Sequence, residues 1–146
     1  MISNTCRYGI RAVIYIASQP KPETNTGLKK IAKDLNIPNP FLAKILQQLA
    51  RHKILYSTKG PHGGFSMLKD PRQISLLDII EIIDGKDFFE NCIIHNEKCQ
   101  YFDKKKIPCP LHEDYDELRL GLVKLFTNET IYNLAKKAGD RGKIII

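Results

Sequence analysis

The sequence predicts a mainly α-helical protein with one small β-hairpin, and three observations support this fold class. Apolar residues recur at helical spacing before Ser18 and again in residues 27–35 and 39–52. A glycine-rich turn, PHGG, separates two strand-like segments, ILYSTKG and FSML. Leucines near the C-terminus alternate at spacings of four and three residues, which is typical of a helix that packs against another long helix.

The N-terminal helices predict a helix-turn-helix. Ser3 or Asn4 can cap a first helix that runs to about Ser18, and the polar segment QPKPETNTG follows as a loop. Two short helices come next, separated by the tripeptide NIP at residues 36–38, and this arrangement is typical of the motif. The buried faces predicted for the three helices consist of Ile10, Val13, Ile14 and Ala17, then Ile31 and Leu35, then Leu42, Ile45, Leu46 and Leu49.

The β-hairpin directly after the helix-turn-helix predicts a wing, so the fold class becomes a winged helix-turn-helix. Gly60, Gly63 and Gly64 permit the positive φ values that a tight hairpin requires. Lys59 and His62 are expected at its tip, where wings contact the DNA backbone or minor groove. For His62 the alternative is an exposed loop histidine without a role.

The remaining chain predicts three further segments. Pro71 ends the second strand, and Ser75 and Gly85 cap a helix with the sequence SLLDIIEIIDG. Residues 86–110 show no helical or strand period, and a short last helix is expected at about 129–138. A long helix is expected between residues 110 and 129. Its apolar residues follow a heptad spacing and form a stripe, the heptad seam, which consists of Leu111, Tyr115, Leu118, Leu122 and Leu125. We therefore expect a DNA-binding domain at 1–85, a cysteine-bearing loop at 86–112, and a dimerisation helix with a C-terminal helix at 113–146.

Charge is distributed unevenly along the chain. Residues 1–60 hold ten Lys or Arg and only two acids, whereas residues 61–146 hold thirteen basic and fourteen acidic residues. A local positive field favours phosphate binding, because neutralised phosphates release condensed counterions. This asymmetry favours DNA binding over a winged helix used only for protein interaction, although a solvated lysine-rich surface would have the same composition.

Three cysteines and a histidine form a candidate metal site. Cys92, Cys99 and Cys109 are spaced C-x6-C-x9-C, and His112 follows as C-x2-H. Thiolates with an occasional histidine hold iron–sulfur clusters, and zinc accepts the same ligand set. The alternatives are a thiol redox switch or thiols without a cofactor. Cys6 lies far from these residues in sequence and is expected to be a small buried hydrophobe.

Other function classes find little support in the sequence. The cysteines and histidines could form a nucleophile and base, but the chain has no glycine-rich phosphate loop, nucleophile elbow or paired-carboxylate motif. No segment approaches the roughly 18 apolar residues of a membrane span, and no signal peptide is evident. We therefore expect a cytoplasmic protein that is not an enzyme and has no membrane partner.

Four segments carry a resemblance to a known family: RYGIRAVIYIA (7–17), LKKIAKDLNIPNPFLAKILQQL (28–49), LYSTKGPHGGFSMLKDP (55–71) and ISLLDIIEIIDG (74–85). They resemble the Rrf-two family of winged-helix transcriptional regulators, which includes an iron–sulfur cluster regulator, a nitric-oxide-sensing repressor and a cysteine-metabolism repressor. The resemblance implies a homodimer that binds a palindromic operator on double-stranded DNA, and a two-iron or four-iron cluster in the cysteine loop. Exposed clusters degrade in air, so protein purified aerobically can lack the cofactor.

The resemblance also implies roles for particular residues. Family members that bind a cluster use a varying fourth ligand, which is either a histidine after the third cysteine, matched by His112, or an acid of helix 1, where this chain has Arg7. The second gap between cysteines is longer here than in those members. An acid that tunes site choice in some members is replaced by Ala43. The predicted DNA contacts of this regulator, which we expect to be a repressor, are Lys29, Asn39, Lys44, Gln47, Gln48, Arg51, Lys59 and His62.

Overall fold

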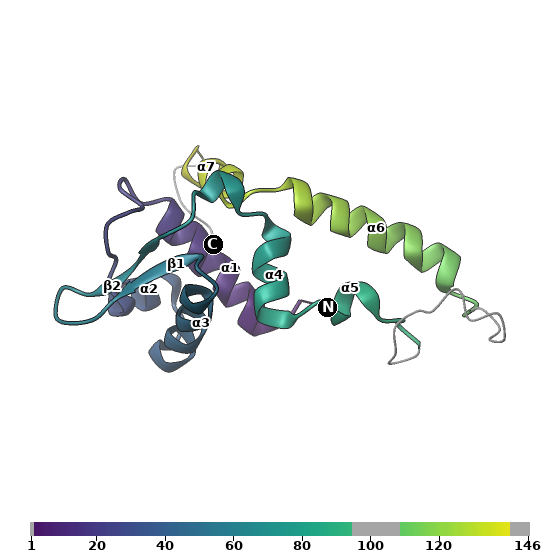
Figure 1. The fold of residues 1–146 in the computed structure, drawn as a ribbon, viewed down its shortest axis with the longest axis horizontal. Coiled ribbons are helices and arrows are strands. Elements are labelled where there is room, and N and C mark those ends of the chain that lie inside the picture. The colour runs from purple at the N-terminus through teal and green to yellow at the C-terminus, as the bar shows by residue number, and fades with distance from the viewer. Residues whose placement is uncertain (1, 95–108, 141–146) are drawn as a thin grey trace.

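The computed structural model describes residues 2–94 and 109–140, which form a helical body with one hairpin and one projecting helix (Figure 1). The fold class expected from the sequence, mainly α with a small antiparallel hairpin, is confirmed. In chain order the elements are α1 (Asn4–Ala17), α2 (Leu28–Leu35), α3 (Asn39–Arg51), β1 (Leu55–Thr58), β2 (Gly64–Met67), the 3₁₀ turn η1 (Pro71–Gln73), α4 (Leu76–Asp84), α5 (Asp87–Glu90), α6 (His112–Asn128) and α7 (Ile131–Asp140).

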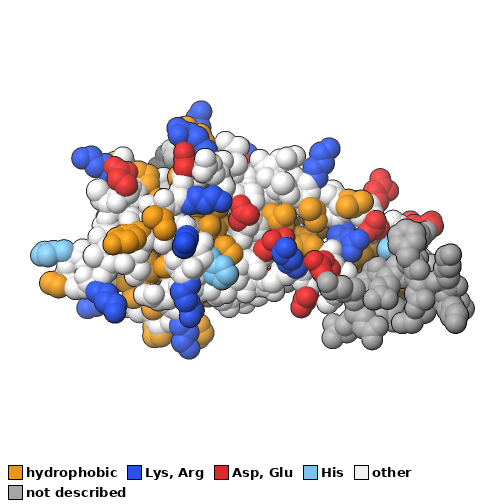
Figure 2. Space-filling model, viewed as in Figure 1, with side chains coloured by type: hydrophobic (Ala, Val, Ile, Leu, Met, Phe, Trp, Pro, Cys, Tyr) orange, Lys and Arg blue, Asp and Glu red, His pale blue; other side chains and the backbone are white. Residues whose placement is uncertain are grey.

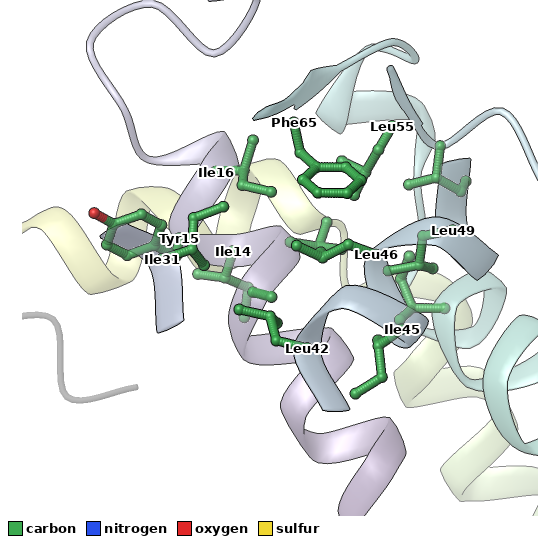
Figure 3. Close-up of a cluster of buried hydrophobic side chains, with 14 of the residues drawn as sticks. Ile14, Tyr15, Ile16, Ile31, Leu42, Ile45, Leu46, Leu49, Leu55 and Phe65 are labelled. Carbon is green, nitrogen blue, oxygen red and sulfur yellow. The ribbon is translucent and has the colours of Figure 1, made fainter. Parts of the chain in front are cut away.

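Helix α1 lies at the centre of the hydrophobic core. Figure 3 shows its Ile14 and Ile16 near side chains of α3 and the hairpin, including Leu46 and Phe65, while Tyr15 points away from them. The single buried stripe expected for this helix was too narrow. Because α2, α3, α4 and α7 all pack against α1, its buried residues extend round the helix and include Ala12, Tyr15 and Ile16. The burial of these residues fixes α3 relative to the rest of the domain.

The turn between α2 and α3 has the geometry that the tripeptide NIP predicts. Asn36 adopts the left-handed conformation at φ 53°, which Asn tolerates better than most residues. The amide of Ile37 then donates to the carbonyl oxygen of Ala32 at 2.9 Å, and its side chain is buried. On the outer side of α2, the Tyr15 hydroxyl donates to Asp34, and burial together with this carboxylate raises the pKa of Tyr15 to about 12. The hydroxyl therefore stays protonated and joins α1 to α2.

The helix caps follow the sequence closely. Ser3 caps α1 by accepting from the amide of Cys6, and Ser75 caps α4 in a capping box with Asp78. Gly85 ends α4 at φ 84°, as expected. The short helix α5 falls within residues 86–110, where no regular structure was expected, because a single turn is too short to show a period.

The last described helix returns to the winged domain. Ile131 and Ala135 of α7 are buried in the same core as α1, and the amide of Ile131 donates to the carbonyl oxygen of Ile74 at 2.9 Å. Helix α6 projects from the body, whereas α7 packs into the same core as α1. Over the described residues, no helix has the length and apolarity that crossing a membrane requires.

Candidate functional site

Helix α3 presents a basic and polar face to solvent. Leu42, Ile45, Leu46 and Leu49 are buried against the core, so Lys44, Gln47 and Arg51 lie on the opposite, exposed side. An open hollow of about 450 Å³ follows this side of the helix, and its lining residues are Ala43, Lys44, Gln47, Gln48 and Arg51. Most of the side chains that line this hollow are polar or basic, so the exposed face of α3 can contact polar groups of a second macromolecule.

The two glutamines of α3 differ in their surroundings. Gln48 is half-buried, and its side-chain amide donates to the carbonyl oxygen of Ile82 in α4 at 2.7 Å. Gln47 is exposed, and its amide lies 3.4 Å from the hydroxyl of Ser57 in β1. Of the two candidate contacts, Gln47 remains available to a ligand, whereas Gln48 connects α3 to α4. No local pattern distinguishes these two neighbours, because Ile82 is distant along the chain.

The start of α3 is electrostatically suited to an anion. Pro38 occupies the N-cap position without a side-chain cap, and the first turn contains no acidic residue. The amide groups at a helix N-terminus carry partial positive charge and attract phosphates. Asn39, the first residue of the helix, and Lys29 on α2 are both exposed.

The wing is a two-stranded antiparallel hairpin in which Leu55 pairs with Met67 and Thr58 with Gly64. Lys59 and His62 lie in the connecting loop and are exposed, as their place in the sequence suggests. A further backbone pairing, between Thr26 and Phe65, anchors the hairpin to the segment before α2. The sequence analysis missed this pairing, since one bridge within a polar loop has no period.

The wing glycines do not all serve the same purpose. Gly60 and Gly64 adopt positive φ values of 101° and 154°, as expected. Gly63 does not have a positive φ, so that expectation was wrong for this residue. Its requirement is steric, because a Cβ at Gly63 would overlap the carbonyl oxygen of Thr58.

Basic and acidic side chains predominate in different parts of the molecule, the winged domain and the region around α6. Figure 2 shows Lys and Arg side chains spread over the winged part, while Asp and Glu side chains gather mainly toward α6. The first turn of α6 alone carries Glu113 and Asp114. The basic part therefore contains the exposed face of α3 and the wing.

Two of the candidate metal ligands lie next to each other. Cys92 follows α5 and Cys109 precedes α6, and their Sγ atoms are 3.6 Å apart. The backbone amide of His112 donates to the carbonyl oxygen of Cys109 at 2.9 Å, so these two residues share one turn. Cys99 lies outside the described residues, and within the described ranges 2–94 and 109–140 no group of three or more His, Cys, Asp or Glu is arranged to hold a metal ion.

The distance between these thiols fits a shared metal ion. Two thiolates on one tetrahedral ion with metal–sulfur bonds of about 2.3 Å lie roughly 3.8 Å apart. The 3.6 Å between Cys92 and Cys109 is close to this value, although the residues are seventeen positions apart. The same separation also lies within reach of a disulfide after a small movement.

Cys6 has a different environment, as the sequence suggested. Its side chain is fully buried in an apolar cluster with Ile80 and Phe89. Burial, with a smaller effect of Asp84, raises the pKa of the Cys6 thiol to about 12. This thiol is therefore protonated at neutral pH and is a poor nucleophile or ligand.

The heptad seam of α6 lies on the surface. Val123 and Phe126 hold α6 against α4 and α5, and the Phe126 ring meets Phe89 edge to face at 6.1 Å between centroids. The seam occupies an adjacent face, where Leu118 is 68%, Leu125 55% and Leu122 39% exposed. These leucines have no apolar cover within the described part of the chain.

Comparison with known proteins identifies the family. The model of the Rrf2 family, described as "Iron-dependent Transcriptional regulator", matches residues 2–137. The chain belongs to this family. A relative from Aquifex aeolicus, named as a helix-turn-helix-type transcriptional regulator, is 36% identical over 134 residues, which cover 92% of this chain and 90% of the relative.

Solved structures of Rrf2-like regulators share the fold. The global cysteine regulator CymR of B. subtilis superposes with a TM-score of 0.77 at 23% identity, covering 94% of this chain and 97% of CymR. IscR of T. potens superposes with a TM-score of 0.74 at 20% identity, covering 97% and 90%. With the family assignment, the resemblance expected from the sequence is confirmed, and this Rrf2 protein is a transcriptional regulator and not an enzyme.

Proposed function

We propose that this Rrf2 protein is a DNA-binding repressor that acts in the cytoplasm as a homodimer and senses redox, nitric-oxide or iron–sulfur status through a cluster ligated by Cys92, Cys99, Cys109 and His112. One observation carries the sensing part of the proposal. Cys92 and Cys109 approach to 3.6 Å at the point where the chain passes from the winged domain to α6. A ligand held there connects the DNA-binding part to the helix that carries the exposed seam.

The exposed face of α3 is proposed to enter the major groove, and the wing to contact the backbone or minor groove. Lys44 and Arg51 suit guanine edges or phosphates, and Gln47 and Asn39 suit adenine. Lys29, Lys59 and His62 are exposed, and we propose that they contact the flanking backbone. Gln48 is proposed not to contact a base, since its side-chain amide already donates to the carbonyl oxygen of Ile82 in α4.

Replacing Gln47 with alanine should change the preferred DNA sequence. One bidentate base contact contributes about 1–3 kcal/mol of discrimination, so the preference at one position of each half-site should weaken roughly 5- to 150-fold. Binding-site selection on the variant measures this change. Gln48→Ala is the matched control: it should lower thermal stability and leave the selected motif unchanged. An unaltered motif for Gln47→Ala would contradict the assignment of this helix face.

The homodimer is proposed from the seam of α6. Leu118, Leu122 and Leu125 form an exposed apolar stripe on a helix whose other contacts already hold it in place. A second copy of the chain can cover this stripe by presenting the same stripe in a twofold arrangement. Two α3 helices would then meet half-sites about one helical turn, or roughly 34 Å, apart on a palindrome.

The cluster is supported by the donor set and by the family. The 3.6 Å between the Sγ atoms of Cys92 and Cys109 suits two ligands of one site, and the description of the family as iron-dependent favours iron over zinc. A bound cluster would supply an iron centre that reacts with oxidants or nitric oxide. The alternative is a regulator without a cluster that uses thiol oxidation or a protein partner, which the 3.6 Å thiol pair also permits.

Anaerobic reconstitution tests the cluster. Treatment of the purified protein with iron and sulfide should give a brown protein with visible absorption and matching iron and sulfide content. Cys99→Ser should abolish the colour, whereas Cys6→Ser, which alters a buried thiol outside the site, should retain it. A colourless product from the unmodified chain would favour the thiol-oxidation alternative.

A further inference from the structure

Phe41 is an unusual residue on α3. Its side chain is 62% exposed, whereas the other large apolar residues of that helix, including Leu42 and Ile45, are buried. An exposed phenyl ring gains nothing from water, and it is among the side chains that folding most often buries. The exposed ring is therefore accessible to a partner that approaches α3.

The surrounding contacts prevent Phe41 from turning inward. Leu42 is fully buried in the core, and Ile45 and Leu46 pack on the same side. Rotating α3 to bury Phe41 would expose these three residues. The chain fixes the ring at the margin of the exposed face, in the first turn of the helix and one turn before Lys44.

The chemistry beside Phe41 indicates the partner. Lys44 and Arg51 make this face basic, and the N-terminus of α3 has no acid in its first turn. An apolar protein partner would be a poor match for such a face, whereas DNA matches its charge. The major groove offers one apolar group, the 5-methyl of thymine, and Phe is among the side chains that contact it.

We propose that Phe41 contacts the 5-methyl group of a thymine in each operator half-site and makes that base a specificity determinant. The inference rests on the proposed DNA-binding role of α3 and deepens it. The N-terminal residues of a recognition helix are those that approach base edges most closely. The phenyl ring is then shielded from water by the methyl group when thymine occupies that position.

Deoxyuridine substitution tests the contact, since uracil differs from thymine only by the missing methyl group. A site obtained by selection from random double-stranded DNA is remade with each thymine replaced singly by deoxyuridine. Affinity for the full-length protein and for Phe41→Ala is measured by anisotropy at one salt concentration. One position per half-site should lose about fourfold in affinity for the unmodified protein, the effect of burying one methyl group. The same replacement should leave Phe41→Ala binding unchanged.

Further variants separate this contact from other effects. Phe41→Leu, which keeps an apolar side chain, should retain part of the sensitivity to deoxyuridine at the same position. Equal sensitivity of the unmodified protein and Phe41→Ala at every thymine would overturn the proposal. Dissociation of Phe41→Ala into monomers in sedimentation would also overturn it and place the ring in an interface between copies. A selection that returned no site would contradict DNA binding by α3 itself, and the contact with it.

Discussion

The double substitution Leu118→Asp with Leu122→Asp is expected to convert the protein to monomers and to abolish operator binding. Both leucines lie on the exposed seam of α6, where a carboxylate would have to be buried without a partner when two copies associate. A monomer engages one half-site and loses the gain from linked binding, which is about 10²- to 10⁴-fold. Sedimentation measures the association state, and anisotropy with a selected operator measures the affinity.

Leu120→Asp provides the matched control for this experiment. Leu120 is 59% exposed on a different face of the same helix, so the substitution adds the same charge without entering the seam. It should leave both dimerisation and operator affinity unchanged. The folded monomer should survive in the double variant, since Val123 and Phe126 still hold α6 against the body. An unmodified chain that remained monomeric at micromolar concentration would rule out the dimer.

Local signals in the sequence predicted the elements of the winged domain. The caps at Ser3, Ser75 and Gly85 depend on residues within one helical turn, so short-range chemistry was enough to place them. The turn at Asn36 and the glycine-rich wing loop depend in the same way on backbone conformations that few residues adopt. The overall class followed from these elements, because a hairpin directly after two short helices has few ways to pack.

Contacts between distant segments were not predictable in the same way. The return of α7 to α1 depends on Ile131 packing in one core with side chains of α1 and with Ile74, which are far from it in the sequence, and no periodicity predicts such a contact. The backbone pairing of Thr26 with Phe65 and the hydrogen bond from Gln48 to Ile82 also join segments that are far apart in the sequence. Each is a tertiary contact that only the assembled chain reveals.

The candidate site also combines local signals with tertiary contacts. The distribution of charges and cysteines in the sequence indicated a basic N-terminal part and a cysteine segment, but it did not distinguish the surroundings of Gln47 from those of Gln48. Phe41 was overlooked, because an aromatic residue next to Leu42 has the composition of a core segment. Its exposure depends on the orientation that the buried leucines impose on α3.

Reconstituted and cofactor-free protein are expected to differ in operator affinity by about 5- to 150-fold, the usual range for coupling between two sites. Cys92 lies two residues after the end of α5, and Cys109 lies three residues before the start of α6. Holding both thiols in one site restrains the start of α6 relative to α4 and α5. Since the seam on α6 is proposed to orient the partner copy, this restraint should set the separation of the two α3 helices. Affinity can shift only by the difference in stability between the two arrangements.

The measurement compares both forms on one selected operator at a fixed salt concentration, because phosphate contacts make affinity depend on salt. The variant with Cys92, Cys99 and Cys109 all changed to Ser should show a single affinity whether or not iron and sulfide are supplied. Cys6→Ser should keep the difference, since its buried thiol lies outside the loop. Equal affinities of the coloured and colourless forms of the unmodified chain would separate cluster binding from DNA binding. The cysteine pair at the start of α6 would then have no part in regulation, and the winged domain would act as a repressor without a sensor.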